Sequence, residues 1–287
     1  MAELSTMATM MVLTFLVASM LSLGMQTTVA DLRALLASRS FLARTLLANF
    51  LVVPILGVAL ILLLPLQPHV AGALLLLACT PGGVSAIQFT GQVKGSAASS
   101  VAVMCLLAGL AVFISPLLLK LVLPADVRLV IPYGGALLFF LVYLIAPLLV
   151  GMLLLGSAPD VAAKLSKLVA LVGIVAFVGF MVATGSVRQP TVGEMGGVAV
   201  AAMLLFIALS MAVGWFMGGS ARDAQRILAT ATSMRNAALC IAIVEASAPG
   251  HAILVPLIAF SLLMVPTNLL FSIYNTVQAK RRAREAP

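Results

Sequence analysis

Charged residues are scarce in this chain of 287 residues: Asp, Glu, Lys and Arg make up 8% of it, whereas 63% is hydrophobic. Soluble domains carry roughly 25% charged and 45–50% apolar residues, so this composition excludes a water-soluble globule. A chain this apolar cannot cover its surface with polar groups, and a lipid bilayer is the solvent that suits it. The composition therefore predicts a polytopic membrane protein.

Cysteine and histidine are also few, and their positions exclude several kinds of site. Cys79, Cys105 and Cys240 lie singly inside apolar runs, with no Cys-x-x-Cys motif and no histidine beside them. This pattern argues against a disulfide framework and against a metal site. His69 and His251 fall at the ends of predicted helices, and no Asp lies within an apolar run. Because an enzyme inside the membrane needs paired carboxylates or a Ser–His pair at depth, we expect neither an enzyme nor a bound cofactor.

Other signatures are missing as well. The net charge of +8 does not indicate nucleic-acid binding, because no basic stretch is interleaved with aromatic residues. A channel would show rings of like charge or a repeated filter motif, and neither is present. The first residues include Glu3 but no Lys or Arg, whereas a signal peptide begins with positive charge. We therefore expect the first apolar run to stay in the membrane.

The apolar runs are long and continuous. A helix needs about 20 residues to cross ~30 Å of hydrocarbon, whereas β-barrel strands are short and alternating. The sequence predicts an all-α fold of nine transmembrane helices: Met7–Val29, Thr45–Leu64, Val70–Gln92, Ser96–Leu119, Leu129–Gly156, Leu165–Thr184, Gly197–Gly218, Ile227–Ala246 and Ile253–Val277. The longest predicted connector runs from Ala30 to Arg44, so residues 1–287 are expected to form a single transmembrane domain.

The positive charges predict the orientation. With the N-terminus outside, the inner side receives twelve Lys and Arg residues: Arg33, Arg39, Arg44, Lys94, Lys164, Lys167, Arg222, Arg226, Lys280, Arg281, Arg282 and Arg284. The outer side receives Lys120, Arg128 and Arg188. Cytoplasmic loops are enriched in Lys and Arg, so we expect the N-terminus outside and the C-terminus in the cytoplasm, in a bacterial inner membrane.

The third predicted helix carries a sequence that interrupts helices. Pro81 removes a backbone donor and Gly82-Gly83 loosen the chain near the bilayer centre, and the polar residues Ser85 and Gln88 follow. A simple proline kink would explain Pro81 alone. The whole group favours a broken helix whose second half directs free N–H groups toward a ligand.

The eighth predicted helix contains the one remaining positive charge, Arg235. Five of the seven residues from Thr230 to Asn236 are polar, and Thr232 and Ser233 are among them. An arginine near the midplane costs roughly 2.5–3.5 kcal/mol to insert, so it normally faces a partner or a wet cavity. The alternatives are a structural ion pair or an arginine that snorkels to the interface. The nearest acid within a span, Glu245, is about three turns away, which favours a fixed charge that awaits an anion.

Corresponding positions of these two interrupted helices predict an inverted repeat. Helices one to four and six to nine can be matched in order, with the interrupted helices third in each set. Helix one enters from outside and helix six from inside, so the two sets have opposite topology. Interrupted helices at matching places of two inverted halves are typical of a transporter's midplane site.

Four segments resemble the bile acid:sodium symporter family over about residues 10–278. They are the segment 76–103 with Cys-Thr-Pro-Gly-Gly-Val-Ser-Ala, the segment 233–239 with Ser-Met-Arg-Asn-Ala-Ala-Leu, the segment Asn-Phe-Leu-Val-Val-Pro at 49–54, and Phe260-Ser261. The resemblance implies alternating access between a core, 45–119 and 197–277, and a panel, 7–29 and 129–184. It also implies that the first helix of ten-helix members is missing here.

The resemblance further implies where sodium would bind. The family's ligands fall on Ala86, Ile87, Ser100, Met104, Ala231 and Arg235, with Asn49 and the backbone near Thr232 and Met234. Hard cations need several oxygen ligands, and only Asn49, Ser100 and the Met234 backbone remain as residual positions. Two unit charges ~4 Å apart at an effective dielectric of ~20 repel by about 4 kcal/mol, so Arg235 also opposes a bound cation. Sodium coupling is therefore expected to be weak or absent.

The sequence thus predicts a secondary transporter or facilitator for a small organic anion such as a carboxylate or a bile-acid-like molecule. Its predicted binding residues are Arg235, Asn236, Ser233, Thr232, Ser85, Gln88 and Ser261. Alternatives are a sodium-coupled organic anion symporter and a proton-linked carrier of the auxin-efflux type. The substrate, the direction of transport and the oligomeric state, with a monomer as one alternative, stay open.

Overall fold

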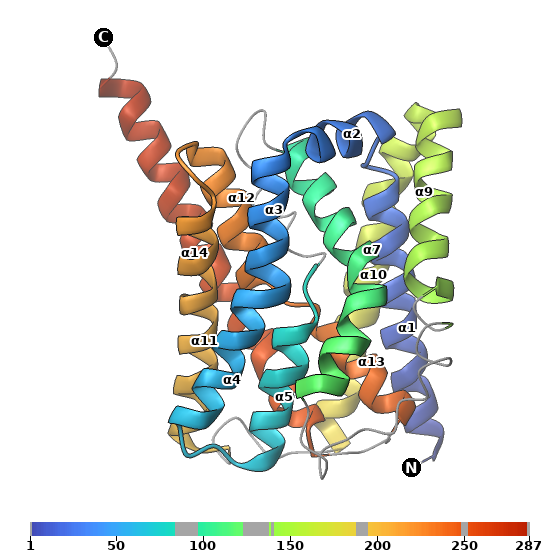
Figure 1. Ribbon diagram of the computed structural model, residues 1–287. Helices are drawn as coiled ribbons and strands as arrows, with labels where there is room; N and C mark the ends of the chain where they lie inside the picture. The colour runs from blue at the N-terminus through green and yellow to red at the C-terminus, as the bar shows by residue number, and fades with distance from the viewer. Residues whose placement is uncertain are drawn as a thin grey trace.

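Figure 1 shows the computed structural model, a bundle of helices whose two termini lie at opposite ends. The structure describes residues 2–83, 97–122, 138, 141–187, 195–247 and 252–285, and in these ranges it has helices and no strands. The helices are α1 (Ala2–Gly24), α2 (Val29–Ala37), α3 (Arg39–Leu47), α4 (Val53–Leu63), α5 (Pro68–Cys79), α7 (Ala97–Val122), α9 (Ala146–Ser157), α10 (Pro159–Val187), α11 (Gly196–Met217), α12 (Arg222–Ser233), α13 (Ala237–Ser247) and α14 (Leu254–Glu285). Two short π-helical turns, η1 (Ala48–Val52) and η2 (Leu141–Ile145), precede α4 and α9.

Several of these helices are long and apolar enough to cross a membrane. In the described residues five segments qualify, namely Arg39–Leu63, Pro159–Phe180, Gly196–Met217, Arg222–Val244 and Leu254–Gln278, and the number rises to seven if each of two bent pairs counts as one span. The helices Pro68–Cys79 and Leu141–Ser157 are apolar but shorter. The protein is therefore an all-helical membrane protein, and the nine spans and the inverted repeat stay predictions.

The segment predicted as the longest connector, residues 30–44, is largely helical. α2 occupies most of it, turned by 79° from α1, and α3 begins at Arg39. Thr28 and Asp31 form a capping box at the start of α2: the Asp31 N–H donates to the Thr28 hydroxyl, and the Thr28 N–H donates to the Asp31 carboxylate, both at 3.0 Å. These bonds satisfy backbone donors that a helix start leaves free, so the chain turns and continues as a helix.

Prolines shape three of the long segments. η1 ends two residues before Pro54, and η2 ends two residues before Pro147. A proline has no N–H for the carbonyl four residues earlier, and its ring crowds that carbonyl. α7 is bent by 57° near residue 112, four residues before Pro116. The first π-helical turn matters for the site, because it contains Asn49.

The described helices pack in two groups. α1 lies along α10 and α9, and α9 also contacts α10. In the other group α11 packs against α12, α4 packs against α5, and α14 contacts both α5 and α11. Figure 1 shows α1 and α9 at one side of the bundle, with α11, α12 and α14 at the other. α13 contacts α1 as well as α14, so it joins the two groups.

Candidate functional site

Two helical segments are interrupted, and their breaks lie against each other. One break follows α5 and the other separates α12 from α13. The Gly83 N–H donates to the Met234 carbonyl at 3.3 Å, and the Asn236 N–H donates to the Thr80 carbonyl at 3.0 Å. The Thr80 hydroxyl also lies 2.9 Å from the Cys240 sulfur. Each break thus supplies partners for backbone groups that the other leaves without a helical bond, as lipid-embedded backbone requires.

The first break depends on the three residues that the sequence singles out. Pro81 disfavours a helical conformation at the residue before it, and α5 ends two residues upstream. Gly82 has a φ of 89°, and a Cβ there would lie 2.9 Å from the backbone nitrogen of Ala108 on α7. A Cβ on Gly83 would lie 2.7 Å from the Arg235 carbonyl oxygen. The two glycines therefore allow α7 and the second break to approach the backbone closely.

The second break contains neither proline nor glycine. Met234 is extended, with φ −88° and ψ 101°, and its carbonyl leaves the helical ladder to accept the bond from Gly83. The Asn236 side chain then starts α13, because its Oδ1 accepts the Leu239 N–H at 3.1 Å. Contacts with a distant part of the chain, rather than local propensity, hold this segment open.

Arg235 lies at the centre of the crossing and is fully buried, with 0% of its surface exposed. Its Nε donates to the Leu77 carbonyl at 2.8 Å, and its Nη2 donates to the Ala78 carbonyl. Its Nη1 donates to Asn49 Oδ1 at 3.0 Å and to the Thr232 carbonyl at 3.5 Å. The guanidinium therefore binds protein oxygens from three segments.

These partners explain how an arginine is accommodated inside the bundle. Leu77 and Ala78 belong to the last turn of α5, whose carbonyls have no helical partner and form the negative end of the helix dipole. A guanidinium carries five donors in a fixed fork and complements such a helix end. The sequence predicts a charge that awaits an anion, and the structure shows most of the donors of Arg235 already paired with the protein.

Asn49 is held in place by the π-helical turn η1. It is fully buried, and its Nδ2 donates to the Thr45 carbonyl at 3.0 Å, which leaves Oδ1 to accept the bond from Arg235. The widened turn therefore presents one amide oxygen to the crossing. Asn49, which the resemblance assigns to a residual cation position, therefore accepts a hydrogen bond from the Arg235 guanidinium.

Other predicted positions are occupied by bonds within the protein. The Thr232 hydroxyl donates to the Ser210 carbonyl at 2.6 Å, and the Ser233 hydroxyl donates to Asn268 Oδ1 at 2.8 Å. Ser100 is fully buried on α7. Thr232 and Ser233 thus tie the end of α12 to α11 and α14.

The positions that the resemblance assigns to sodium ligands offer few oxygens. Ala231 and Met104 are fully buried and have no side-chain oxygen. In the part of the chain that the structure describes, no group of three or more His, Cys, Asp or Glu residues could hold a metal ion. Ala86 and Ile87 lie outside the described residues. Among the assigned side chains that the structure describes, only those of Asn49 and Ser100 have an oxygen, and Asn49 Oδ1 accepts a bond from Arg235.

A cavity of about 460 Å³ lies between the α1–α10 pair and the crossing. The predicted site residues that line it are Gly83, Arg235, Asn236 and Ser261. Asn236 is 4% exposed, and its Nδ2 has no hydrogen-bond partner among the described residues. Ser85 and Gln88 lie outside the described residues. The crossing thus lines a cavity of the size of a small organic molecule, and one lining residue has an amide donor without a partner among the described residues.

The opposite wall of the cavity contains polar residues that the sequence analysis did not assign to the site. α1 contributes Ser22 and Gln26, which lie one turn apart, and α10 contributes Ser166 and Lys167. The Ser22 hydroxyl donates to the Ser166 carbonyl at 2.9 Å, and Gln26 Nε2 donates to the Ser22 carbonyl at 3.0 Å. Farther along, Phe15 and other apolar side chains of α1 and α10 line the cavity. The cavity therefore has a polar region with one ammonium and an apolar region.

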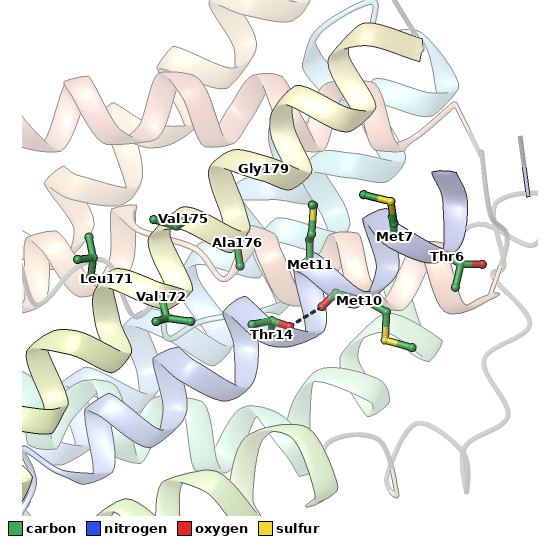
Figure 2. Close-up of a pocket in the computed structure, with 10 residues that line it drawn as sticks. All are labelled: Thr6, Met7, Met10, Met11, Thr14, Leu171, Val172, Val175, Ala176 and Gly179. Carbon is green, nitrogen blue, oxygen red and sulfur yellow. Dashed lines mark hydrogen bonds between the residues drawn. The ribbon is translucent and has the colours of Figure 1, made fainter. Parts of the chain in front are cut away.

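A second, larger hollow of about 930 Å³ lies along α1 and α10, near the beginning of α1. Figure 2 shows the side chains that line it: α1 contributes Met7, Met10 and Met11 with two threonines, and α10 contributes apolar residues that include Val172 and Val175. The hydroxyl of one of them, Thr14, donates to the Met10 carbonyl at 2.8 Å. This open groove has no charged residue in its described lining, and its polar side chains there are the two threonines.

Comparison with known proteins agrees with these features. The model of the sodium bile acid symporter family matches residues 13–195. Among curated proteins, the chain is 32% identical over 160 residues to a probable sodium/metabolite cotransporter, BASS2, chloroplastic, from rice (Oryza sativa subsp. japonica). That match includes 54% of this chain and 36% of the rice protein, so the chain spans about a third of that relative's length.

Proposed function

The chain belongs to the sodium bile acid symporter family, and we propose that it is a secondary transporter of a small organic anion that works by alternating access. Its all-helical, membrane-spanning architecture agrees with this role. In the proposed mechanism the helices α1, α9 and α10 form a panel that moves against the core around the crossing. Substrate binds between the two parts.

The cavity between α10 and the crossing carries this proposal. It lies where two interrupted helices meet, and Asn236, whose Nδ2 has no partner among the described residues, lines it together with Ser261 of α14. A buried amide without a partner costs about 1–3 kcal/mol, and a ligand acceptor removes that cost. An acidic group of a substrate offers such an acceptor, and the positive end of α13 adds to its stabilisation.

Sodium coupling is not part of the proposal. Arg235 already donates to the α5 carbonyls and to Asn49, so a permanent positive charge is present without a bound ion. A sodium ion beside it would lack oxygen ligands at Ala231 and Met104 and would be repelled by the guanidinium. We propose that Arg235 stabilises the crossing in the way that a bound cation otherwise would. The protein then carries its substrate independently of sodium.

We further propose a plasma-membrane location in a bacterium, with the N-terminus outside. The support is the excess of Lys and Arg on the side where α1 ends and α10 begins. In this orientation the polar region of the cavity, with Gln26 and Lys167, lies toward the cytoplasm.

Uptake into proteoliposomes tests the proposed function. The purified protein is reconstituted and given radiolabelled cholate, benzoate and hexanoate, and their uncharged carboxamides serve as matched controls. Vesicles without protein measure passive leakage, which is substantial for small weak acids. Saturable, protein-dependent uptake of at least one carboxylate, but not of its carboxamide, supports an anion transporter. Equal uptake with and without protein for all three carboxylates contradicts it.

A further inference from the structure

We propose that Lys167, and not Arg235, is the residue that recognises the charge of the transported anion. This inference rests on the proposed function and adds the specificity-determining residue for it. Arg235 is the obvious candidate from the sequence, because it is a cation at membrane depth. The two residues differ in burial, in hydrogen bonding and in their position in the cavity.

Arg235 has little capacity left for a substrate. Its side chain is completely buried, and all three of its guanidinium nitrogens donate to protein oxygens. An anion that paired with it directly would have to take donors away from the Ala78 carbonyl or from Asn49. Both acceptors would then be buried without a partner, which opposes the exchange.

Lys167 has the opposite properties. It lines the same cavity, its side chain is exposed, and within the described ranges it has no hydrogen bond or ion pair. Its ammonium has three donors on a flexible stem, so it can follow an acidic group into the cavity. Its polar neighbours Ser22 and Gln26 bond to each other through the Gln26 amide nitrogen, and no hydrogen bond joins either of them to Lys167 among the described residues.

The shape of the cavity defines the kind of anion. Lys167, Ala170, Ile174 and Phe177 recur at three- and four-residue intervals, so they share one face of α10, and all four line the cavity. From residue 167 to residue 177 the helix rises about 15 Å. The far end is apolar, where the rings of Phe15 and Phe177 lie with centroids 4.7 Å apart. A molecule with one carboxylate or sulfonate and an apolar body matches this polarity.

A matched pair of lysines makes the inference testable. Lys164 is also exposed, lies one turn earlier on α10 and is outside the described lining of the cavity. Lys167→Met and Lys164→Met therefore remove the same charge from the same helix, and only the first removes it from the cavity. Lys167→Arg keeps the charge.

The experiment measures KM and the maximal rate of uptake in proteoliposomes with radiolabelled cholate, or with benzoate if cholate is not carried. Lys167→Met is expected to raise KM about tenfold, because one charge-assisted contact near the water-exposed end of the site is lost. Lys164→Met is expected to stay within about twofold of the wild type, and Lys167→Arg, which keeps the charge, is expected to raise KM less than Lys167→Met does. Higher ionic strength should raise KM in the wild type more than in Lys167→Met, because salt screens an exposed charge.

The outcomes distinguish this inference from the proposed function. If the wild type carries the carboxylate and Lys167→Met has the same KM as Lys164→Met, Lys167 does not recognise the anion, and the transporter assignment stands. If the wild type carries none of the three carboxylates, the proposed function fails and this inference fails with it. A large rise in KM confined to Lys167→Met supports both.

Discussion

Replacing Arg235 by methionine is expected to destabilise the protein, because the guanidinium holds the crossing together. Of its acceptors, the Leu77 carbonyl keeps a second bond from the Thr80 N–H at 3.1 Å. The Ala78 carbonyl and Asn49 Oδ1 lose the donor that Arg235 provides. A buried polar group without a partner costs about 1–3 kcal/mol, so two of them cost about 2–6 kcal/mol.

Two further substitutions of Arg235 separate the contribution of its charge from that of its hydrogen-bond donors. Arg235→Lys keeps the charge but has a single ammonium, and Arg235→Gln keeps one amide donor group without the charge. We expect the midpoint of thermal unfolding in detergent to fall in the order wild type, Lys, Gln, Met. Lys120→Met, which removes an exposed charge at the end of α7, serves as the control and should unfold close to the wild type.

One result would refute this reasoning. Burying an arginine has its own desolvation cost, and an apolar residue of similar volume can be neutral or stabilising when that cost dominates. An Arg235→Met protein that unfolds at or above the wild-type temperature would show that the guanidinium bonds do not stabilise the crossing. The role proposed for Arg235 as a built-in cation would then be wrong.

Three other changes test the site and the topology. Gly83→Ala puts a Cβ 2.7 Å from a backbone oxygen and should abolish uptake and lower thermal stability. In the control Gly156→Ala the Cβ would meet nothing within 4 Å, so it should do neither, and equal behaviour of the two variants would contradict the close crossing. Asn236→Asp keeps the oxygen that caps α13 but replaces the unpaired donor, so it should fold and lose anion uptake; unchanged uptake would exclude Asn236 from the site. In a cysteine-free background, a membrane-impermeant thiol reagent added outside should label Glu194→Cys and should not label Lys164→Cys. The reverse pattern would contradict the predicted orientation.

The sequence predicts the two breaks with unequal clarity, for a physical reason. Pro81-Gly82-Gly83 is a local signal, because proline and glycine change the backbone wherever they occur. The segment around Met234 has no such residue, and its conformation depends on bonds to Thr80 and Gly83, more than 150 positions earlier. Polar composition indicates that the second segment is unusual, but partners so far away in the chain cannot be read from it.

The helix α2 shows a local signal that was present and overlooked. Thr28 and Asp31 have the spacing of a capping box, and they stand directly before an apolar stretch. Residues 30–44 were interpreted as a connector because the spans were drawn from the long apolar runs alone. The capping box therefore predicts the start of α2 better than the length of the apolar stretch does.

The sequence indicates how deep in the membrane a charged residue lies, but it does not indicate which groups its side chain meets. The position of Arg235 in the chain indicates that it lies inside the membrane, and its burial follows from that. Its acceptors are backbone carbonyls of α5, which every helix has, so no residue type marks them in advance. Lys167 was predicted to lie at the inner end of the helix Leu165–Thr184 and was not assigned to the site, because periodicity along α10 does not tell which face meets α1 and the cavity.

Sodium binding to the purified protein tests the central claim most directly, because it needs no knowledge of the substrate. Equilibrium binding of radioactive sodium is measured for the wild type and for Arg235→Gln, with potassium as the competing ion. We predict no saturable sodium binding in either protein, because Arg235 occupies the crossing in the first and because Ala231 and Met104 provide no oxygen in both. Saturable, potassium-resistant sodium binding by the wild type would contradict the account and make the protein a sodium-coupled carrier.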